Sequence, residues 1–326
     1  MTRFVLQVAG FLALQFLLGA LLLRGYDVPG ESNYLAGIRD KLRRAAETAS
    51  PRILLVGGSN VPFGFRSDLL ASLTGRPVVN VGLAAGIGSE FMLAQAAQVA
   101  RPGDVILLSL EYDQFASGPR AGAWSGQGFD PAILQQVLVF HPGSVACLGP
   151  THFRKVVLDR GLRILGEVIR RRVGQAFVPA PRDPAGDRRR RGFNEHGDAV
   201  GHWDLPSRMD PAVLARARLV GEARGFPNPA LLGHLARFVA RQRERGVAVA
   251  FTFPPKPATA LAHDAPLAGQ LAAALRSIPG LRVLDQPADH GYPPELFFDT
   301  ANHLTGEGAR RRTERVAIAL EPGWER

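Results

Sequence analysis

Short apolar runs alternate with helix-like segments along most of this chain. The strand-like runs are RILLVGG, PVVNVGLA and DVILLSLEY in the first half, and VAVAFTF and LRVLDQ in the second. Segments with helical spacing, such as RSDLLASL and SEFMLAQAAQVA, lie between them. Near-continuous Val, Ile and Leu runs are typical of parallel strands covered on both faces. The pattern predicts an α/β fold with a doubly wound parallel sheet, in one domain over residues 51–326.

The alternation fails between residues 115 and 210. The helix-like run FRKVVLDRGLRILGEVIRRRV comes first, and PAPRDPAGDRRRRGFNEHGDAVGHW follows it. The second run is rich in Pro, Gly and Arg, which favours an exposed loop. We therefore expect residues 115–210 to form an insertion into the single α/β domain.

The first 25 residues predict a single-pass membrane anchor. Residues 4–23 are apolar apart from Gln7 and Gln15, and roughly 20 helical residues cross a hydrocarbon core of about 30 Å. No small-residue cleavage site follows, because the apolar run continues directly into Arg24. An uncleaved anchor is therefore favoured over a signal peptide or a buried helix.

Residues 26–50 follow the anchor and contain YLAGIRDKLRRAAETA, whose spacing predicts a juxtamembrane helix. Basic residues are more numerous on this side of the anchor than before it, the downstream ones being Arg24, Arg39, Lys41, Arg43 and Arg44. By the positive-inside rule, this charge distribution alone would keep the domain in the cytoplasm.

The chain carries 39 Lys and Arg residues against 29 Asp and Glu residues, for a formal net charge of +10. Such an excess either suits anionic partners or reflects an arginine-rich solvated surface. No basic stretch is interleaved with stacking aromatic residues, so we expect no nucleic-acid partner. The single cysteine, Cys147, excludes an intramolecular disulfide and a multi-cysteine metal site.

Ligands of an open parallel sheet bind beyond the carboxyl ends of its strands, so the residues there are the first candidates for chemistry. The first strand ends in Gly57-Gly58-Ser59-Asn60. A glycine turn in this place either cradles a phosphate or exposes a nucleophilic hydroxyl. The Lys-Ser/Thr pair of a P-loop is missing, which favours the nucleophile.

A second glycine string, NVGLAAGIGSE, follows the second strand and contains Gly82, Gly86 and Gly88. It imitates a dinucleotide-binding fingerprint but lacks the acidic residue that would bind a ribose. A nucleotide-binding domain therefore remains the weakest alternative. The third strand ends in LEYD, residues 110–113.

An Asp and a His precede the last predicted helix, in the run FFDTANHLTGEGARRRTERVAIAL. Thr305 can cap that helix, which leaves Asp299 and His303 on the loop at the mouth of the sheet. A serine hydroxyl is a weak nucleophile at neutral pH, and a histidine oriented by a carboxylate can remove its proton. Ser59, His303 and Asp299 are therefore the candidate catalytic residues.

The loop FNEHGDAVGHW offers two lesser candidates. It contains potential metal ligands that lack regular spacing, namely Glu195, His196, Asp198 and His202. Its Trp203 could instead stack on a sugar ring.

These blocks resemble the SGNH, or GDSL-like, hydrolase superfamily over residues 52–113 and 247–320. Gly57-Gly58-Ser59-Asn60 is similar to its first motif, with Gly58 where the family has aspartate. Asp299 and His303 are similar to its last motif, with three residues between them where the family has two. The third block has Tyr112 where the family offers an asparagine.

The resemblance implies a flavodoxin-like SGNH fold, with Ser59 as nucleophile, His303 as base and Asp299 as its orienting carboxylate. The oxyanion would be bound by the Ser59 amide and an amide near Gly86. Asn60 or the Tyr112 hydroxyl would replace the missing asparagine as a donor. Neither a metal nor an organic cofactor is implied.

The anchored chain with FFDTANHLTGEGARRRT is similar to membrane-tethered SGNH-like proteins that work beside membrane-bound O-acyltransferases in bacterial polysaccharide modification. This implies an esterase or O-acyltransferase that moves acetyl groups of a cell-surface polysaccharide through an acyl-serine. Its partners would be the polymer or an acyl donor and a membrane-bound O-acyltransferase. The domain would lie on the periplasmic side of the inner membrane, against the charge rule. The alternative is a degenerate domain that binds polysaccharide or scaffolds an acyltransferase.

Overall fold

The computed structural model describes residues 34–116, 190–221 and 225–320, together with positions 3, 4, 6, 7, 10, 11 and 13–15. Its centre is a five-stranded sheet with strand order β2-β1-β3-β4-β6, in which every neighbouring pair is parallel. The strands are β1 (Ile53–Gly57), β2 (Val78–Asn80), β3 (Val105–Ser109), β4 (Ala248–Phe251) and β6 (Leu281–Val283). The predicted α/β class and parallel sheet are confirmed.

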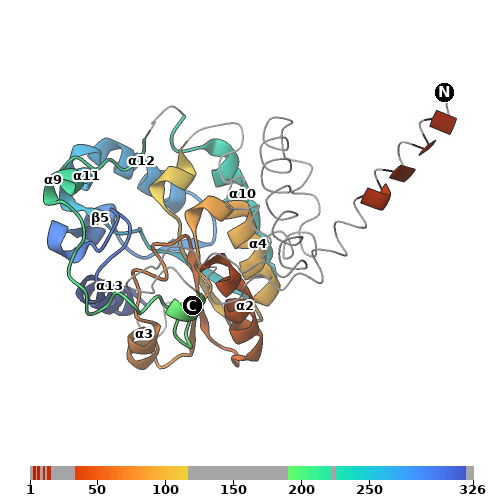
Figure 1. Cartoon of the computed structure of the whole chain (residues 1–326), viewed down its shortest axis with the longest axis horizontal. Coiled ribbons are helices and arrows are strands. Elements are labelled where there is room, and N and C mark those ends of the chain that lie inside the picture. Colours follow the sequence, from red (N-terminus) through yellow and green to blue (C-terminus); the bar gives the residue numbers. More distant parts are fainter. Residues whose placement is uncertain are drawn as a thin grey trace, which may run out of the picture.

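Helices cover both faces of this sheet (Figure 1). One face packs against α2 (Gly37–Glu47), α4 (Ser89–Val99), α10 (Pro229–Glu244) and α12 (Ala265–Arg276). The other face packs against α3 (Ser67–Thr74) and α13 (Gly306–Ala319). In β1, Leu54 and Val56 face the first layer, whereas Ile53 and Leu55 face the second. All five β1 residues are buried, which is why the strand reads as an unbroken apolar run.

Smaller elements surround the carboxyl edge of the sheet. They include α9 (Pro211–Ala215), α11 (Ala258–His263) and a two-stranded pair, β5 (Lys256–Pro257) with β7 (Gly291–Tyr292). The 3-10 turns are η1 (Tyr34–Ala36), η2 (Ala85–Ile87), η3 (Tyr112–Phe115), η6 (Arg190–Gly192), η7 (Pro287–His290) and η8 (Pro294–Leu296). Two of these turns, η1 and η2, contribute to the pocket described below.

Several arginines are structural. Arg52 is fully buried, pairs with Asp104 at 3.1 Å and donates to the Val99 carbonyl at the end of α4. Arg101 and Arg245 donate to further carbonyls at the ends of α2 and α4. The last carbonyls of a helix lack intrahelical donors, so cations there stabilise it. Part of the basic excess therefore serves the fold.

The predicted anchor over residues 1–25 lies largely outside the described residues. The few described positions there are helical, and Phe4, Leu6, Phe11 and Leu14 are exposed. Among the residues that were described, no helix combines the length and apolar character needed to span a membrane. Residues 26–50 are helical where they form η1 and α2, and α2 packs against the sheet through Ile38 and Ala45; residues 26–33 are not described, and the predicted position beside a membrane stays a prediction. Most of the predicted insertion also lies outside the described part.

Candidate active site

Other groups closely approach both glycines of the turn after β1. A Cβ on Gly57 would lie 2.1 Å from the Ser109 carbonyl oxygen. A Cβ on Gly58 would lie 2.2 Å from a carboxylate oxygen of Glu111. The contact with the Ser109 backbone excludes a side chain at Gly57, whereas a side chain at Gly58 would require the Glu111 carboxylate to move. The absence of a Cβ at Gly57 lets β1 and β3 end side by side. Ser59 follows directly, half-buried at the carboxyl edge of the sheet.

Asn60 fixes this turn to the end of β3. Its backbone N–H donates to Glu111 Oε1 at 3.2 Å, and its side-chain Nδ2 donates to the Ser109 carbonyl at 2.9 Å. Its Oδ1 accepts from Ser109 Oγ at 3.0 Å. The residue is fully buried, and its polar groups are engaged within the fold. Asn60 therefore holds Ser59 in place and does not line the pocket, contrary to its predicted role as an oxyanion donor.

Arg312 joins the same turn to α13. This arginine is fully buried and donates to the Asn60 carbonyl at 2.9 Å and to Ser109 Oγ at 2.7 Å. Its guanidinium also lies 4.1 Å from the centre of the Phe65 ring. Burial lowers its pKa to about 10, so it stays protonated at neutral pH. A single side chain thus connects the turn that carries Ser59 with the helix that begins just after His303.

His303 is oriented by a carboxylate and by an aromatic ring. Its Nδ1 lies 2.6 Å from Asp299 Oδ1, and its ring stacks on Phe63 with centroids 4.2 Å apart and planes 13° apart. An ionised carboxylate only accepts hydrogen bonds, so Nδ1 carries the proton and Nε2 keeps its lone pair. Thr305 caps α13 as predicted, its hydroxyl accepting from the Gly308 amide at 3.3 Å. This arrangement suits a general base that acts through Nε2.

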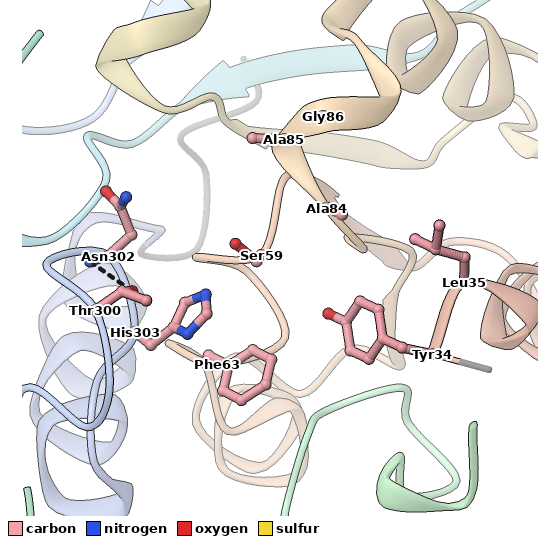
Figure 2. Close-up of a pocket in the computed structure, with 10 residues that line it drawn as sticks. All are labelled: Tyr34, Leu35, Ser59, Phe63, Ala84, Ala85, Gly86, Thr300, Asn302 and His303. Atoms are coloured by element: carbon pink, nitrogen blue, oxygen red, sulfur yellow. Dashed lines mark hydrogen bonds between the residues drawn. The ribbon is translucent and has the colours of Figure 1, made fainter. Parts of the chain in front are cut away.

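Ser59 and His303 line the same pocket, which has a volume of about 480 Å³ (Figure 2). Pockets of about 300–1,000 Å³ are typical of small-molecule sites. Figure 2 shows the Ser59 hydroxyl and one His303 ring nitrogen on facing sides of a short gap. The lining residues are Tyr34, Leu35, Ser59, Phe63, Ala84, Ala85, Gly86, Thr300, Asn302 and His303. Asp299 lies behind His303.

Two residues that line this pocket have backbone amides without an acceptor in the described part of the chain. Within the described chain, the N–H groups of Ser59 and Ala85 donate no hydrogen bond. Ala85 begins the η2 turn, and Gly86 beside it also lines the pocket. Amides in this position can stabilise negative charge on an oxygen bound between them.

Tyr112 does not take part in the pocket. It is fully buried in η3, and its ring packs 6.3 Å from that of Phe253. Burial raises its pKa, and the hydroxyl finds no hydrogen-bond partner among the described residues. Its predicted role as an oxyanion donor fails for a physical reason, because the chain turns after β3 and directs the ring into the core.

The loop that carried the metal and sugar hypotheses is packed against the domain. Asp198 is fully buried and accepts from Ser67 Oγ at 2.6 Å and from Asn80 Nδ2 at 2.8 Å. The Arg66 guanidinium lies 4.6 Å from the centre of the Trp203 ring. No group of three or more His, Cys, Asp or Glu that could hold a metal occurs in the described ranges.

His202 instead supports the active-site histidine from behind Phe63. Its ring lies 4.9 Å from that of Phe63 and 4.8 Å from that of Phe298. Its Nε2 lies 2.9 Å from the Leu304 carbonyl oxygen, which can only accept. Burial lowers the pKa of His202 to about 4, so the ring is neutral at physiological pH. Phe63 thus stacks on His303 on one side and meets the tilted His202 ring as well.

A second histidine–carboxylate pair lies elsewhere. His290 Nε2 is 2.7 Å from Asp285 Oδ2, and the Thr252 hydroxyl donates to the same carboxylate. His290 is fully buried, burial lowers its pKa, and it does not line the pocket. Because Thr252 follows β4 and Asp285 follows β6, these hydrogen bonds join the ends of the two strands and are structural contacts.

No family model matches the chain, and no curated protein matches its sequence. The geometry of the pocket and the resemblance of the motifs are therefore the grounds for a function.

Proposed function

We propose that this protein is a serine esterase or O-acyltransferase of SGNH type that works through an acyl-serine at Ser59. The observation that carries the proposal is the pocket shared by Ser59 and the Asp299-bound His303. These residues are far apart in sequence, and each comes from a loop at the carboxyl edge of a parallel sheet. Ligands of such sheets bind at this edge.

In the first half of the reaction, Ser59 Oγ attacks the carbonyl carbon of an ester while His303 Nε2 takes the hydroxyl proton. The carbonyl oxygen becomes an oxyanion and receives hydrogen bonds from the Ser59 and Ala85 amides. Asp299 stabilises the imidazolium that forms. The bond from carbon to the alcohol oxygen then breaks, His303 protonates the departing alcohol, and the acyl group stays on Ser59.

The second half reverses these roles with a new nucleophile. Water or a sugar hydroxyl gives its proton to His303 Nε2 and attacks the acyl-serine. The bond to Ser59 breaks, and the serine recovers its proton from His303. Hydrolysis and acyl transfer differ only in the nucleophile of this step.

The biological setting follows from the motif resemblance and the apolar N-terminal segment. We propose a single-pass inner-membrane protein with its domain in the periplasm, acting on acetyl groups of a cell-surface polysaccharide. The partners are that polymer or an acyl donor, and a membrane-bound O-acyltransferase.

A non-catalytic polysaccharide-binding or scaffolding domain is the second candidate. It is favoured by the fact that no hydrogen bond joins the Ser59 and His303 side chains, both of which are described. Asn60 and Tyr112 do not line the pocket, so only backbone amides remain as donors to the oxyanion. Losing one side-chain donor costs about 3 kcal/mol of transition-state stabilisation.

A fluorophosphonate probe distinguishes the two candidates. We expect it to label the full-length wild-type chain, and Ser59→Ala to abolish labelling, because the probe reacts only with an activated serine. Ser277→Ala is the matched control, since this exposed serine bonds to the Ala274 carbonyl at the end of α12 and should leave labelling unchanged. Folded wild-type protein that takes up no probe would support the scaffold, and labelling that survives Ser59→Ala would exclude Ser59 as nucleophile.

A further inference from the structure

The pocket has two chemically different sides, with Ser59 between them (Figure 2). Tyr34, Leu35 and Ala84 form one side and are predominantly apolar. Thr300, Asn302 and His303 form the other side and carry polar groups. A site that binds an ester must hold an acyl chain and an alcohol in different places, so this asymmetry bears on substrate choice.

The positions of the catalytic groups decide which part of an ester lies on which side. His303 must protonate the departing alcohol, so the alcohol lies on the side of Thr300 and Asn302. The carbonyl oxygen lies at the amides of Ser59 and Ala85. The remaining substituent of the tetrahedral carbon is the acyl chain, and it therefore lies on the apolar side of the pocket.

We propose that Tyr34, Leu35 and Ala84 form the acyl subsite and set the length of the aliphatic chain that the protein accepts, while Thr300 and Asn302 face a polyhydroxylated alcohol. This inference rests on the proposed acyl-serine function. It adds a substrate orientation and assigns a role to η1, which lies before the first strand.

The acyl subsite is preformed. The Tyr34 hydroxyl donates to the Leu83 carbonyl at 2.6 Å, and its ring lies 5.0 Å from Phe193 and 6.3 Å from Phe63. With the hydroxyl engaged, Tyr34 acts as a fixed aromatic wall. Ala84 is nearly buried at 7% exposure, so a larger residue there would take space from the pocket. A rigid subsite discriminates by size because it does not adapt to longer chains.

The opposite side contains a donor that lacks a partner. Asn302 Nδ2 makes no hydrogen bond within the described residues and, unlike the buried Oδ1 of the same side chain, is not closed off from solvent. A ligand hydroxyl oxygen can accept a hydrogen bond from it. The neighbouring Thr300 Oγ1 accepts from the Asn302 amide at 3.2 Å, which holds this segment in shape. A sugar offers several hydroxyl groups to this side.

The test measures kcat/KM of the full chain on p-nitrophenyl esters with two, four, six and eight acyl carbons. Leu35→Ala should raise the preference for the longer esters over acetate, and Ala84→Leu should lower it. Each shift should be about tenfold or more, because one methylene in an apolar pocket changes discrimination by about 10- to 200-fold. Leu73→Ala is the control, since Leu73 is 52% exposed on α3 and does not line the pocket.

A second readout uses the alcohol side. Asn302→Ala should lower kcat/KM for an acetylated sugar more than for p-nitrophenyl acetate, and should leave the chain-length preference as in the wild type.

The outcomes distinguish a failure of the acyl subsite from a failure of the proposed function. If hydrolysis requires Ser59 but neither Leu35→Ala nor Ala84→Leu changes the chain-length profile, the acyl subsite is wrong and the esterase stands. If circular dichroism shows that one variant does not fold, the chain-length profile of the other variant tests the acyl subsite. Hydrolysis that persists in Ser59→Ala, or no hydrolysis of any ester by folded wild-type protein, overturns the proposed function and this inference with it.

Discussion

A row of neutral rings begins at the His303 imidazole. Phe63 stacks on His303, the His202 ring is tilted against Phe63, and Phe298 is tilted against His202. A charged ring at position 202 would lie close to the imidazolium that the mechanism forms at His303. The low pKa of His202, caused chiefly by burial, avoids this repulsion at neutral pH. In the proposed mechanism, His202 would assist by remaining uncharged.

The same burial makes stability depend on pH. The pKa of His202 falls from 6.5 to about 4 on folding, so between these values the unfolded chain binds a proton that the folded chain does not. The free energy of unfolding should therefore decrease as the pH falls from about 6.5 to about 4, by on the order of 3 kcal/mol from this residue. Above pH 6.5 the contribution is fully present.

Urea unfolding at pH 7 and pH 5 measures this effect. His202→Gln keeps an N–H donor for the Leu304 carbonyl but cannot titrate, so its stability should change less between the two pH values than that of the wild type. An equal change in both proteins would show that His202 does not carry the effect.

The relative position of Ser59 and His303 depends on how α13 is joined to the end of β1. Arg312 makes this connection through the Asn60 carbonyl and Ser109 Oγ. His303 and Arg312 lie on either side of the start of α13, so the arginine fixes the turn that carries Ser59 relative to His303. Arg312 does not line the pocket and acts by positioning.

Replacing Arg312 with Lys should slow the reaction more than it weakens substrate binding. A lysine keeps the charge but cannot donate to both partners in the fork geometry of a guanidinium. We expect kcat for ester hydrolysis to fall at least about tenfold with a smaller change in KM, because a small displacement of the serine affects chiefly the transition state. The unfolding free energy should fall by about 1.5–3 kcal/mol for each charged hydrogen bond lost.

The neighbouring Arg311 provides the control. Its side chain is 55% exposed and pairs with Glu307, so Arg311→Lys should leave kcat and stability nearly unchanged. If Arg312→Lys retains wild-type kcat at temperatures where it is folded, the arginine has no positioning role.

The pocket is formed by segments that are distant in the chain and meet at one edge of the sheet. The sequence predicted the parallel sheet and placed Ser59, Gly86 and His303 at that edge, because strand ends and helix caps leave local signals. Asn60 and Tyr112 were misassigned because sequence position does not show which way a side chain points after a strand. Tyr34 and Leu35 were missed because η1 precedes the first strand and reaches the pocket only through tertiary packing.

The most direct test of the central claim is the mass of the covalent intermediate. Full-length protein would be mixed with a short-chain p-nitrophenyl ester, quenched with acid within seconds, digested and measured by mass spectrometry. We expect an acyl adduct on the peptide that contains Ser59, and its absence in Ser59→Ala. Ester hydrolysis with an unmodified Ser59 peptide, or with the adduct on another residue, would contradict it.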